Sequence, residues 1–220
     1  MVWLNVKPRR RLGTENLVSG VRVYGEKLVS VSGREYRTWD PFRSKLAASI
    51  LKGLEIIPFD DGTRVLYLGA STGTTASHVS DLIGESGILF GVEASHRVGR
   101  EFLENVASKR NNTIPIIADA RRPDLYNSIF QQVDTVYCDI AQPDQTRISI
   151  ENCNAYLQDH GCLILIVKSR SIDVTKSPSV VFREEANKLQ TAGFEIRQIM
   201  NLEPFDKDHA LILAHLEEKH

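Results

Sequence analysis

Residues 66–79 read LYLGASTGTTASHV, an apolar run that leads into a small-residue turn and then into a helical pattern. A strand followed by such a turn and a helix is where α/β proteins bind nucleotides. The dinucleotide fingerprint is G-x-G-x-x-G, but Ser71 and Thr74 occupy its second and third glycine positions when counted from Gly69. The stretch by itself fits a damaged dinucleotide loop, a loop for another ligand or only a tight turn.

Apolar runs of the same kind recur along the rest of the chain. Each is short, continuous and rich in Val, Ile and Leu, as expected for strands that are buried on both faces. The runs end at Gly69, Glu93, Asp119, Asp139 and Lys168. Helical stretches such as 98–110 separate most of them, and this alternation predicts right-handed crossovers and a parallel sheet.

The C-terminal part predicts a different connection. A helix over 178–191 is followed by two strands, 194–202 and 209–216, which only EPFDKD joins. This linker is too short for a helical crossover, so the last strand should run antiparallel to the others. Seven strands with a closing antiparallel pair resemble the class I methyltransferase variant of the Rossmann-like, doubly wound α/β sheet.

Residues 1–38 predict a small N-terminal β module with antiparallel strands. Three apolar stretches that glycines separate, NLVSG, VRVYG and KLVSVSG, span residues 16–33 and indicate strands with tight turns. Asp40 and Pro41 then suit the N-cap and the first position of a helix. Apolar residues follow at helical spacing: Leu46, Ile50, Leu51 and Leu54. We therefore expect two parts, the β module and a main domain of residues 39–220.

The composition is that of an ordinary globular protein, with 42% hydrophobic residues, 25% charged residues and a net charge of −1. The charge is unevenly distributed. Residues 1–50 contain ten Lys and Arg against four Asp and Glu, a net +6, whereas the remainder contain seventeen against twenty-four, a net −7. A basic N-terminal part suits a localised anionic partner and a solvated charged surface equally well.

The three cysteines, Cys138, Cys153 and Cys162, are scattered and odd in number. We expect buried thiols in a reducing cytosol, and neither a disulfide framework nor a metal site. The opening MVWLNVKPRRR lacks the apolar run of a signal peptide, and no stretch approaches the ~20 apolar residues of a membrane span. A cytoplasmic location without membrane contact is expected.

Polar side chains follow the apolar runs where each run stops, and ligands of open α/β sheets bind beyond the carboxyl ends of the strands. Glu93 can accept hydrogen bonds from both ribose hydroxyls, and its charge would repel the 2′-phosphate of NADP. Asp119 can accept from an adenine amino group while Ala120 packs on the ring. The alternative for Asp119 is a capping role or a salt bridge to Arg121 or Arg122.

The loop after Gly69 can direct backbone N–H groups at an anion near the start of a helix. The pyrophosphate of NAD would require very close approach of the backbone, whereas the carboxylate of S-adenosylmethionine would not. Ser71 and Thr74 can then replace glycine, and Thr72, Thr74 and Thr75 supply hydroxyls. The loop and the strand-end carboxylates together favour S-adenosylmethionine as the cofactor.

The fourth strand is followed by Asp139, Ile140, Ala141 and Gln142. The methionine end of the cofactor and its methyl group would lie here, and a carboxylate suits the positive charge of that cofactor. Lys168 ends the next strand and should neighbour Asp139, while the reversed last strand brings His209 to the same edge. Lys45, in the helix before the sheet, could cover the site, although Lys45 and His209 taken alone are typical of ordinary surface residues.

Six longer segments span nearly the whole chain: NLVSGVRVYGEKL, EYRTWDPFRSKLAASI, YLGASTGTTASHVSDL, ADAR, CDIAQPDQT and DKDHALIL. Together they resemble the fibrillarin family, the RNA 2′-O-methyltransferases of box C/D ribonucleoproteins. The chain is similar to the short archaeal form, because it has no Gly/Arg-rich N-terminal extension. It departs at Ala94, where the family usually has an aromatic residue, so adenine stacking would be weaker or supplied elsewhere.

The resemblance implies RNA-guided ribose 2′-O-methylation of rRNA and tRNA with S-adenosylmethionine, as the catalytic subunit of a box C/D particle. The implied partners are a Nop-family scaffold protein, a kink-turn-binding ribosomal-type protein, a guide RNA and the target RNA. Such a particle would explain the near-neutral net charge. A homodimer through the β module is the alternative kept open for the oligomeric state.

The resemblance also assigns roles to residues. The catalytic set would fall on Lys45, Asp139, Lys168 and His209. The cofactor contacts would fall on Thr74, Thr75, Glu93, Ala94, Asp119, Ala120, Asp139, Ile140, Ala141 and Gln142. Lys168 would contact the 2′-hydroxyl, either as the base or as an orienting group while Asp139 takes part in proton removal.

Three other functions stay open. An NAD-dependent oxidoreductase shares the strand–loop–helix start, but the loop spacing differs and no second domain of useful size is present. A methyltransferase acting on protein glutamine or on a small molecule would use the same cofactor site. A non-catalytic scaffold would keep the fold, against which the set Asp139, Lys168 and His209 argues.

Overall fold

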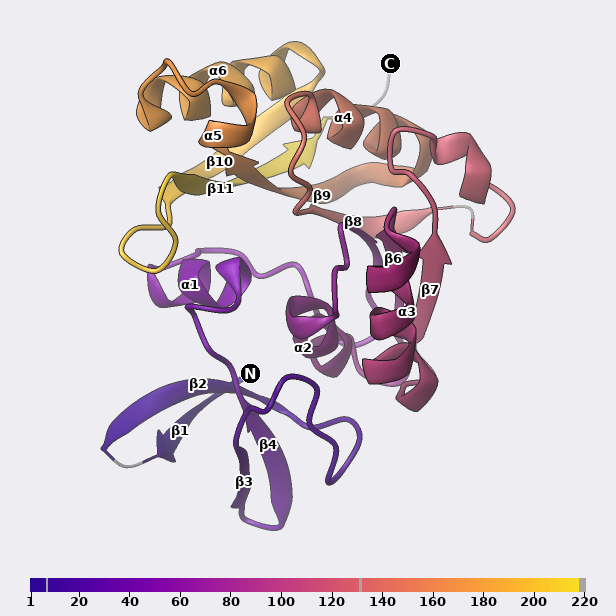
Figure 1. Cartoon of the computed structure of the whole chain (residues 1–220), viewed down its shortest axis with the longest axis vertical. Helices are drawn as coiled ribbons and strands as arrows, with labels where there is room; N and C mark the ends of the chain where they lie inside the picture. The colour runs from indigo at the N-terminus through magenta and orange to yellow at the C-terminus, as the bar shows by residue number, and fades with distance from the viewer. Residues whose placement is uncertain (7, 131, 218–220) are drawn as a thin grey trace.

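The computed structural model of the protein describes residues 1–6, 8–130 and 132–217. Figure 1 shows a small sheet built from the N-terminal strands and a large sheet with helices on both of its faces. The candidate site residues all belong to the larger unit, so its strand order decides where they meet.

The large sheet has seven strands in the order β10-β11-β9-β8-β5-β6-β7. The strands are β5 (Arg64–Leu68), β6 (Ile88–Glu93), β7 (Thr113–Ile117), β8 (Val133–Cys138), β9 (Leu157–Lys168), β10 (Phe194–Asn201) and β11 (His209–Leu216). Neighbours are parallel except at β11, which runs antiparallel to both β9 and β10. The predicted Rossmann-like α/β sheet with a reversed last strand is confirmed.

Helices pack on both faces of this sheet. They are α1 (Lys45–Leu51), α2 (Thr74–Ile83), α3 (His96–Asn105), α4 (Gln145–Tyr156), α5 (Ser169–Ile172) and α6 (Pro178–Thr191), with 3₁₀ turns η1 (Ala107–Lys109) and η2 (Pro123–Tyr126). Side chains alternate along β5. Leu66 and Leu68 join a core with residues of α4 and α6, whereas Val65 and Tyr67 join a second core with residues of α1, α2 and α3. All three cysteines are buried in these cores, and none forms a disulfide within the described residues.

The N-terminal sheet contains β1 (Val2–Val6), β2 (Arg9–Glu15), β3 (Leu28–Val31) and β4 (Arg34–Thr38) in the order β1-β2-β4-β3, all antiparallel. Leu12 on β2 and Trp39 just after β4 pack into the same core as α1 and α2. The small sheet is therefore held on the main unit by shared apolar packing.

The expectation of strands throughout residues 16–33 was wrong for residues 16–25, which form a loop. In this loop, side-chain carboxylates accept hydrogen bonds from backbone N–H groups, a role that a neighbouring strand has in a sheet. The Glu26 carboxylate accepts from the N–H groups of Val23 and Tyr24, and Glu35 Oε1 accepts from Gly20 N–H. Side chains that bind the backbone in this way compete with a strand, and an apolar pattern does not show them.

The expected start of the first helix was also wrong. Asp40 Oδ1 accepts from Phe42 N–H at 2.9 Å in a turn, and α1 begins only at Lys45. Ser44 is the N-cap, because its hydroxyl accepts from Ala47 N–H at 3.3 Å. The Thr75 hydroxyl of α2 donates to Ser44 Oγ at 3.0 Å, so the true cap also ties α1 to the start of α2.

A buried ionic cluster fastens the N-terminal sheet to α2. Arg37 on β4 is fully buried, and it donates to Glu26 Oε1 at 2.6 Å and to Asp81 Oδ2 at 2.9 Å. Asp81 also accepts from Thr14 Oγ1 and from Arg110 Nη1, both at 2.6 Å. Burial raises the pKa of Glu26, but the charge of Arg37 and backbone hydrogen bonds outweigh it and lower that pKa. Two guanidinium groups thus balance two carboxylates.

Replacing Arg37 by Ala should lower the free energy of unfolding by about 3–5 kcal/mol, because it removes one partner of a buried ion pair and leaves Glu26 without it. Urea denaturation followed by circular dichroism measures the change. Arg34→Ala on the same strand is the matched control: Arg34 pairs with Glu15 at the surface, and its loss should cost under ~1 kcal/mol. Equal losses in the two variants would show that the buried cluster is not what holds the sheet in place.

Candidate active site

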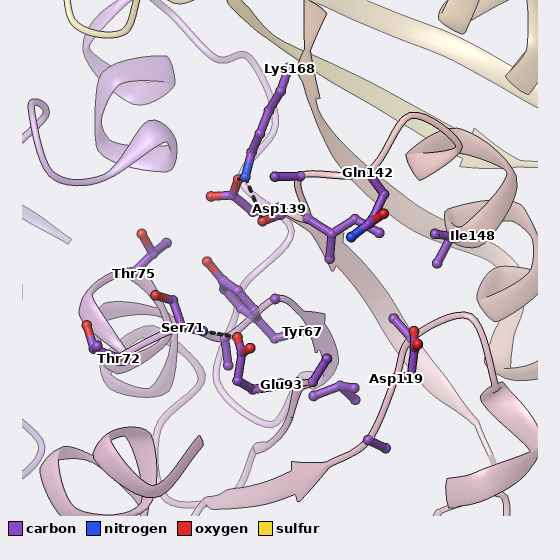
Figure 2. A pocket seen from close by; sticks show the side chains of 18 of the residues that line it. Tyr67, Ser71, Thr72, Thr75, Glu93, Asp119, Asp139, Gln142, Ile148 and Lys168 are labelled. Atoms are coloured by element: carbon purple, nitrogen blue, oxygen red, sulfur yellow. Dashed lines mark hydrogen bonds and ion pairs between the residues drawn. The ribbon is translucent and has the colours of Figure 1, made fainter. Parts of the chain in front are cut away.

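A cavity of about 450 Å³ opens at the carboxyl ends of β5 to β9 (Figure 2). This volume lies within the range of small-molecule binding sites. The predicted site residues that line it are Lys45, Gly69, Thr72, Thr74, Thr75, Glu93, Ala94, Asp119, Ala120, Asp139, Ile140, Ala141, Gln142 and Lys168. Among the predicted site residues, His209 alone does not border this cavity.

The loop between β5 and α2 needs unusual backbone conformations. Gly69 and Gly73 have φ values of 82° and 93°, and Ser71 between them has a φ of 51°. A Cβ atom on Gly69 would lie 2.8 Å from the Asp139 carbonyl oxygen, so this glycine allows two strand ends to approach each other. Gly73 caps α2 without a side-chain hydrogen bond, which leaves the first-turn N–H groups available to an anion.

Glu93, at the end of β6, is held in position by two backbone groups. Its Oε2 accepts from Ser71 N–H and its Oε1 from Ser95 N–H, each at 3.0 Å. A carboxylate has about four lone-pair directions, so both oxygens keep capacity for a further donor. Figure 2 shows the carboxylate between the loop and the cavity, where it can accept hydrogen bonds from a ligand.

Asp119 borders the cavity, and it also forms the salt bridge that was left open as the alternative. Arg121 donates to both carboxylate oxygens, with its Nη2 2.7 Å from Oδ2. These hydrogen bonds lower the pKa of Asp119 below its ordinary value. The pairing keeps Asp119 ionised and therefore an acceptor for an amino group.

Asp139 lies between two lysines. Lys168 Nζ is 2.8 Å from Asp139 Oδ1, and Lys45 Nζ is 3.1 Å from Asp139 Oδ2. Lys168 also donates to the Asp139 carbonyl oxygen at 3.0 Å, so an ion pair and a hydrogen bond to one residue hold its ammonium group. The predicted proximity of Asp139 and Lys168 is confirmed, and Figure 2 shows the lysine reaching down from the end of β9. All three groups are mostly buried.

His209 begins β11 directly opposite Lys168 of β9, as the reversed strand direction predicts. Its ring nevertheless turns to the loop that precedes β11. Nδ1 lies 2.9 Å from Asp206 Oδ1 and 2.6 Å from the Lys207 carbonyl oxygen. His209 therefore lies at the predicted edge of the sheet. The Asp206 carboxylate lies between its ring and the ammonium group of Lys45.

Several lining residues escaped the sequence analysis, among them Arg43, Tyr67 and Ile148. Tyr67 lies within β5 and stacks on Tyr137 with ring centroids 4.5 Å apart. Complete burial and the charge of Asp139 raise the pKa of Tyr67 well above its ordinary value, so the ring stays neutral. A tyrosine inside an apolar run looks like core, and no sequence signal marked its edge as part of the cavity.

The geometry defines two ends of the cavity. One end offers carboxylates, Glu93 and Asp119, to the hydroxyl and amino groups of a nucleoside. The other end offers Asp139 with Lys45 and Lys168, a set that can direct an ammonium group at a reacting oxygen. A ligand that contains a nucleoside fits the first end, and an oxygen that reacts with it fits the second.

Comparison with known proteins agrees with this description. Residues 2–218 match the family model of fibrillarin. A protein of Saccharolobus islandicus named fibrillarin-like rRNA/tRNA 2′-O-methyltransferase is 54% identical over 204 residues, which cover 93% of this chain and 88% of that protein.

Two solved structures extend the likeness to three dimensions. Aeropyrum pernix fibrillarin in complex with natively bound S-adenosyl-L-methionine is 48% identical with a TM-score of 0.87, over 94% of this chain and 89% of that one. A fibrillarin/Nop5p complex contains a chain that is 40% identical with a TM-score of 0.82, over 90% of this chain and 91% of that one. The match over nearly the whole length and the high identity establish that the chain belongs to the fibrillarin family.

Proposed function

We propose that this protein transfers a methyl group from S-adenosylmethionine to the ribose 2′-oxygen of rRNA and tRNA nucleotides. The observation that carries the proposal is the Asp139 carboxylate paired with Lys45 and Lys168 at the end of a nucleoside-sized cavity. A chain 54% identical is named for this activity, and a structure 48% identical holds S-adenosylmethionine.

The residues of the cavity fit this cofactor part by part. Glu93 would accept the ribose hydroxyls and Asp119 the adenine amino group, while the start of α2 would bind the carboxylate of the methionine part. The ring would pack against aliphatic side chains, since position 94 is an alanine and the lining includes Ala120, Ile140 and Ile148. When bound, the cofactor supplies an activated methyl group on a sulfonium. Asp139 is the carboxylate that suits this positive charge.

The lysine pair supports an orienting role for Lys168. Its ammonium group is fixed by the carboxylate and the carbonyl of Asp139, so it is placed as a hydrogen-bond donor to the 2′-oxygen. A lysine whose ammonium group is already placed as a donor is suited to orient the oxygen. Asp139 then accepts the proton of the 2′-hydroxyl, which becomes more acidic as the oxygen forms its new bond. Lys45 holds the second carboxylate oxygen in place.

The activity would require a particle. A Nop-family protein would dock the enzyme, consistent with the solved fibrillarin/Nop5p complex, and a guide RNA with a kink-turn-binding protein would select the nucleotide. A net charge of −1 leaves little phosphate attraction for an enzyme that must choose its RNA alone.

None of the helices within the described part of the chain is long and apolar enough to cross a membrane.

Replacing Lys168 by Ala should lower the rate of methyl transfer by about 10²–10³-fold, a range typical of the loss of one hydrogen-bond donor to a reacting oxygen. The dissociation constant of S-adenosylmethionine should change little, because Lys168 is assigned to the acceptor oxygen. Single-turnover transfer of labelled methyl and isothermal titration calorimetry measure the two quantities. Lys176→Ala is the control, since Lys176 pairs with Glu184 at the surface. Near-normal transfer by the Lys168 variant would refute the assignment.

S-Adenosylmethionine should raise the melting temperature, and NAD at the same concentration should not. At 100 times its dissociation constant, a ligand adds about 2.7 kcal/mol to the free energy of unfolding. Glu93→Ala should reduce this stabilisation because the ribose hydroxyls lose their acceptor. Glu101→Ala on α3, where Glu101 pairs with the exposed Arg97, should leave it unchanged. Stabilisation by NAD alone would favour an oxidoreductase.

Methyl transfer to a chosen nucleotide should require the guide RNA and the Nop-family scaffold protein. Labelled transfer to target RNA, with each component omitted in turn, tests this dependence. A guide with one altered target-pairing segment is the control, and it should move the modified position accordingly. Site-selective transfer by the isolated chain would contradict the particle, and transfer to protein or small molecules with no transfer to RNA would favour the other methyltransferase class.

A further inference from the structure

A second carboxylate, Asp206, lies beside the lysine pair but outside the cavity lining. Its Oδ1 is 2.9 Å from Nδ1 of His209, and its Oδ2 is 3.8 Å from Nζ of Lys45. The two oxygens of one carboxylate therefore face two side chains from different elements, α1 and β11. Among the described residues, no other series of ion pairs connects His209 to Lys45 and Lys168.

The turn that carries Asp206 is fixed at both ends. The N–H groups of Phe205 and Asp206 donate to the Leu202 carbonyl oxygen, at 2.9 and 3.2 Å, and Leu202 N–H donates to the His209 carbonyl oxygen at 2.9 Å. The Phe205 ring packs edge-on against Phe42, with centroids 5.3 Å apart. Backbone hydrogen bonds and an aromatic contact with the segment before α1 thus determine where the carboxylate lies.

We propose that Asp206 is a positioning residue for methyl transfer, which holds Lys45 and His209 against the Asp139–Lys168 pair. The inference rests on the proposed function, since it assumes that this pair acts on the 2′-oxygen. It extends that function by one residue, and it explains how His209, which does not border the cavity, is coupled to the reacting group.

The charges around Asp139 give the physical reason. Lys45 and Lys168 bring two positive charges to one carboxylate in a mostly buried place, and Asp206 supplies the second negative charge. Without it, the ammonium of Lys45 would be drawn to Asp139 alone and would compete with Lys168 for that carboxylate. Displacement of a catalytic group by about 1 Å can cost 10²-fold in rate, so a modest shift of Lys45 suffices for a measurable defect.

The same turn offers a matched control two residues further on. Asp208 also carries a carboxylate, but it lies 3.2 Å from Nε of Arg170 and faces neither Lys45 nor His209 in any ion pair of the described chain. Asp208→Asn removes one negative charge from the same turn, and asparagine tolerates the left-handed backbone found there, where φ is 60°. Any general effect of charge or turn stability should appear in this variant.

The test uses the full chain assembled with guide RNA, target RNA, the Nop-family protein and the kink-turn-binding protein. Asp206→Asn should lower the single-turnover rate by about 10- to 100-fold, while the dissociation constant of S-adenosylmethionine and the melting temperature stay close to those of the parent. Asp206→Glu should recover most of the rate, since it restores a carboxylate within reach of both partners. Asp208→Asn should keep the parent rate within twofold.

A double substitution shows through which partner Asp206 acts. In a His209→Ala background, the rate penalty of Asp206→Asn should be smaller than in the parent, because coupled residues have non-additive effects. Parent-like rates for Asp206→Asn would overturn the proposal, as would an equal loss in Asp208→Asn or a lost response to S-adenosylmethionine. If Lys168→Ala retains its rate, the proposed function itself fails, and that outcome is independent of Asp206.

Discussion

The shared carboxylate of Asp139 is the constraint on which the site depends. One residue at the end of β8 accepts from a lysine of α1 and a lysine of β9, so three separate elements must dock correctly before the group exists. The same residue makes the nucleotide loop possible, because its N–H donates to the Leu68 carbonyl oxygen and its own carbonyl leaves room only for a glycine at position 69. The loop after β5 and the group formed by Asp139, Lys45 and Lys168 are thus parts of one packing arrangement.

The N-terminal sheet supports this arrangement through its contacts with α2. Arg37 binds Ser77 and Asp81 on α2, and α2 begins at the loop that would hold the methionine part of the cofactor. The Ser44 cap of α1 accepts from Thr75 in the first turn of the same helix. The charged cluster and the cap therefore hold both ends of α2 in place. This suits a ligand-binding loop that must have its bound conformation before the ligand arrives.

Strand ends were the features that the sequence predicted well. Buried parallel strands have continuous apolar runs, and the first polar residue after each run must lie at the common edge, as Glu93, Asp119, Asp139 and Lys168 do. The loop at residues 16–25 and the cap at Ser44 were mispredicted, because an apolar pattern does not show which polar side chains bind the backbone in the folded chain. Asp206 and Tyr67 were missed for the same reason: their neighbours are set by tertiary packing and leave no local pattern.

The reversed strand β11 affects how the site comes into being during synthesis. It inserts between β9 and β10, both of which precede it in the chain, so β9 has one unpaired edge until β11 has emerged from the ribosome. Until β11 has paired with β9, Lys168 has no residue opposite it, because His209 belongs to β11. Domains generally fold as units, so the sheet closes only once its last strand is available. The residues that line the cavity all precede β11 in the chain, so the edge at which Lys168 faces His209 is the last part of the sheet to be completed.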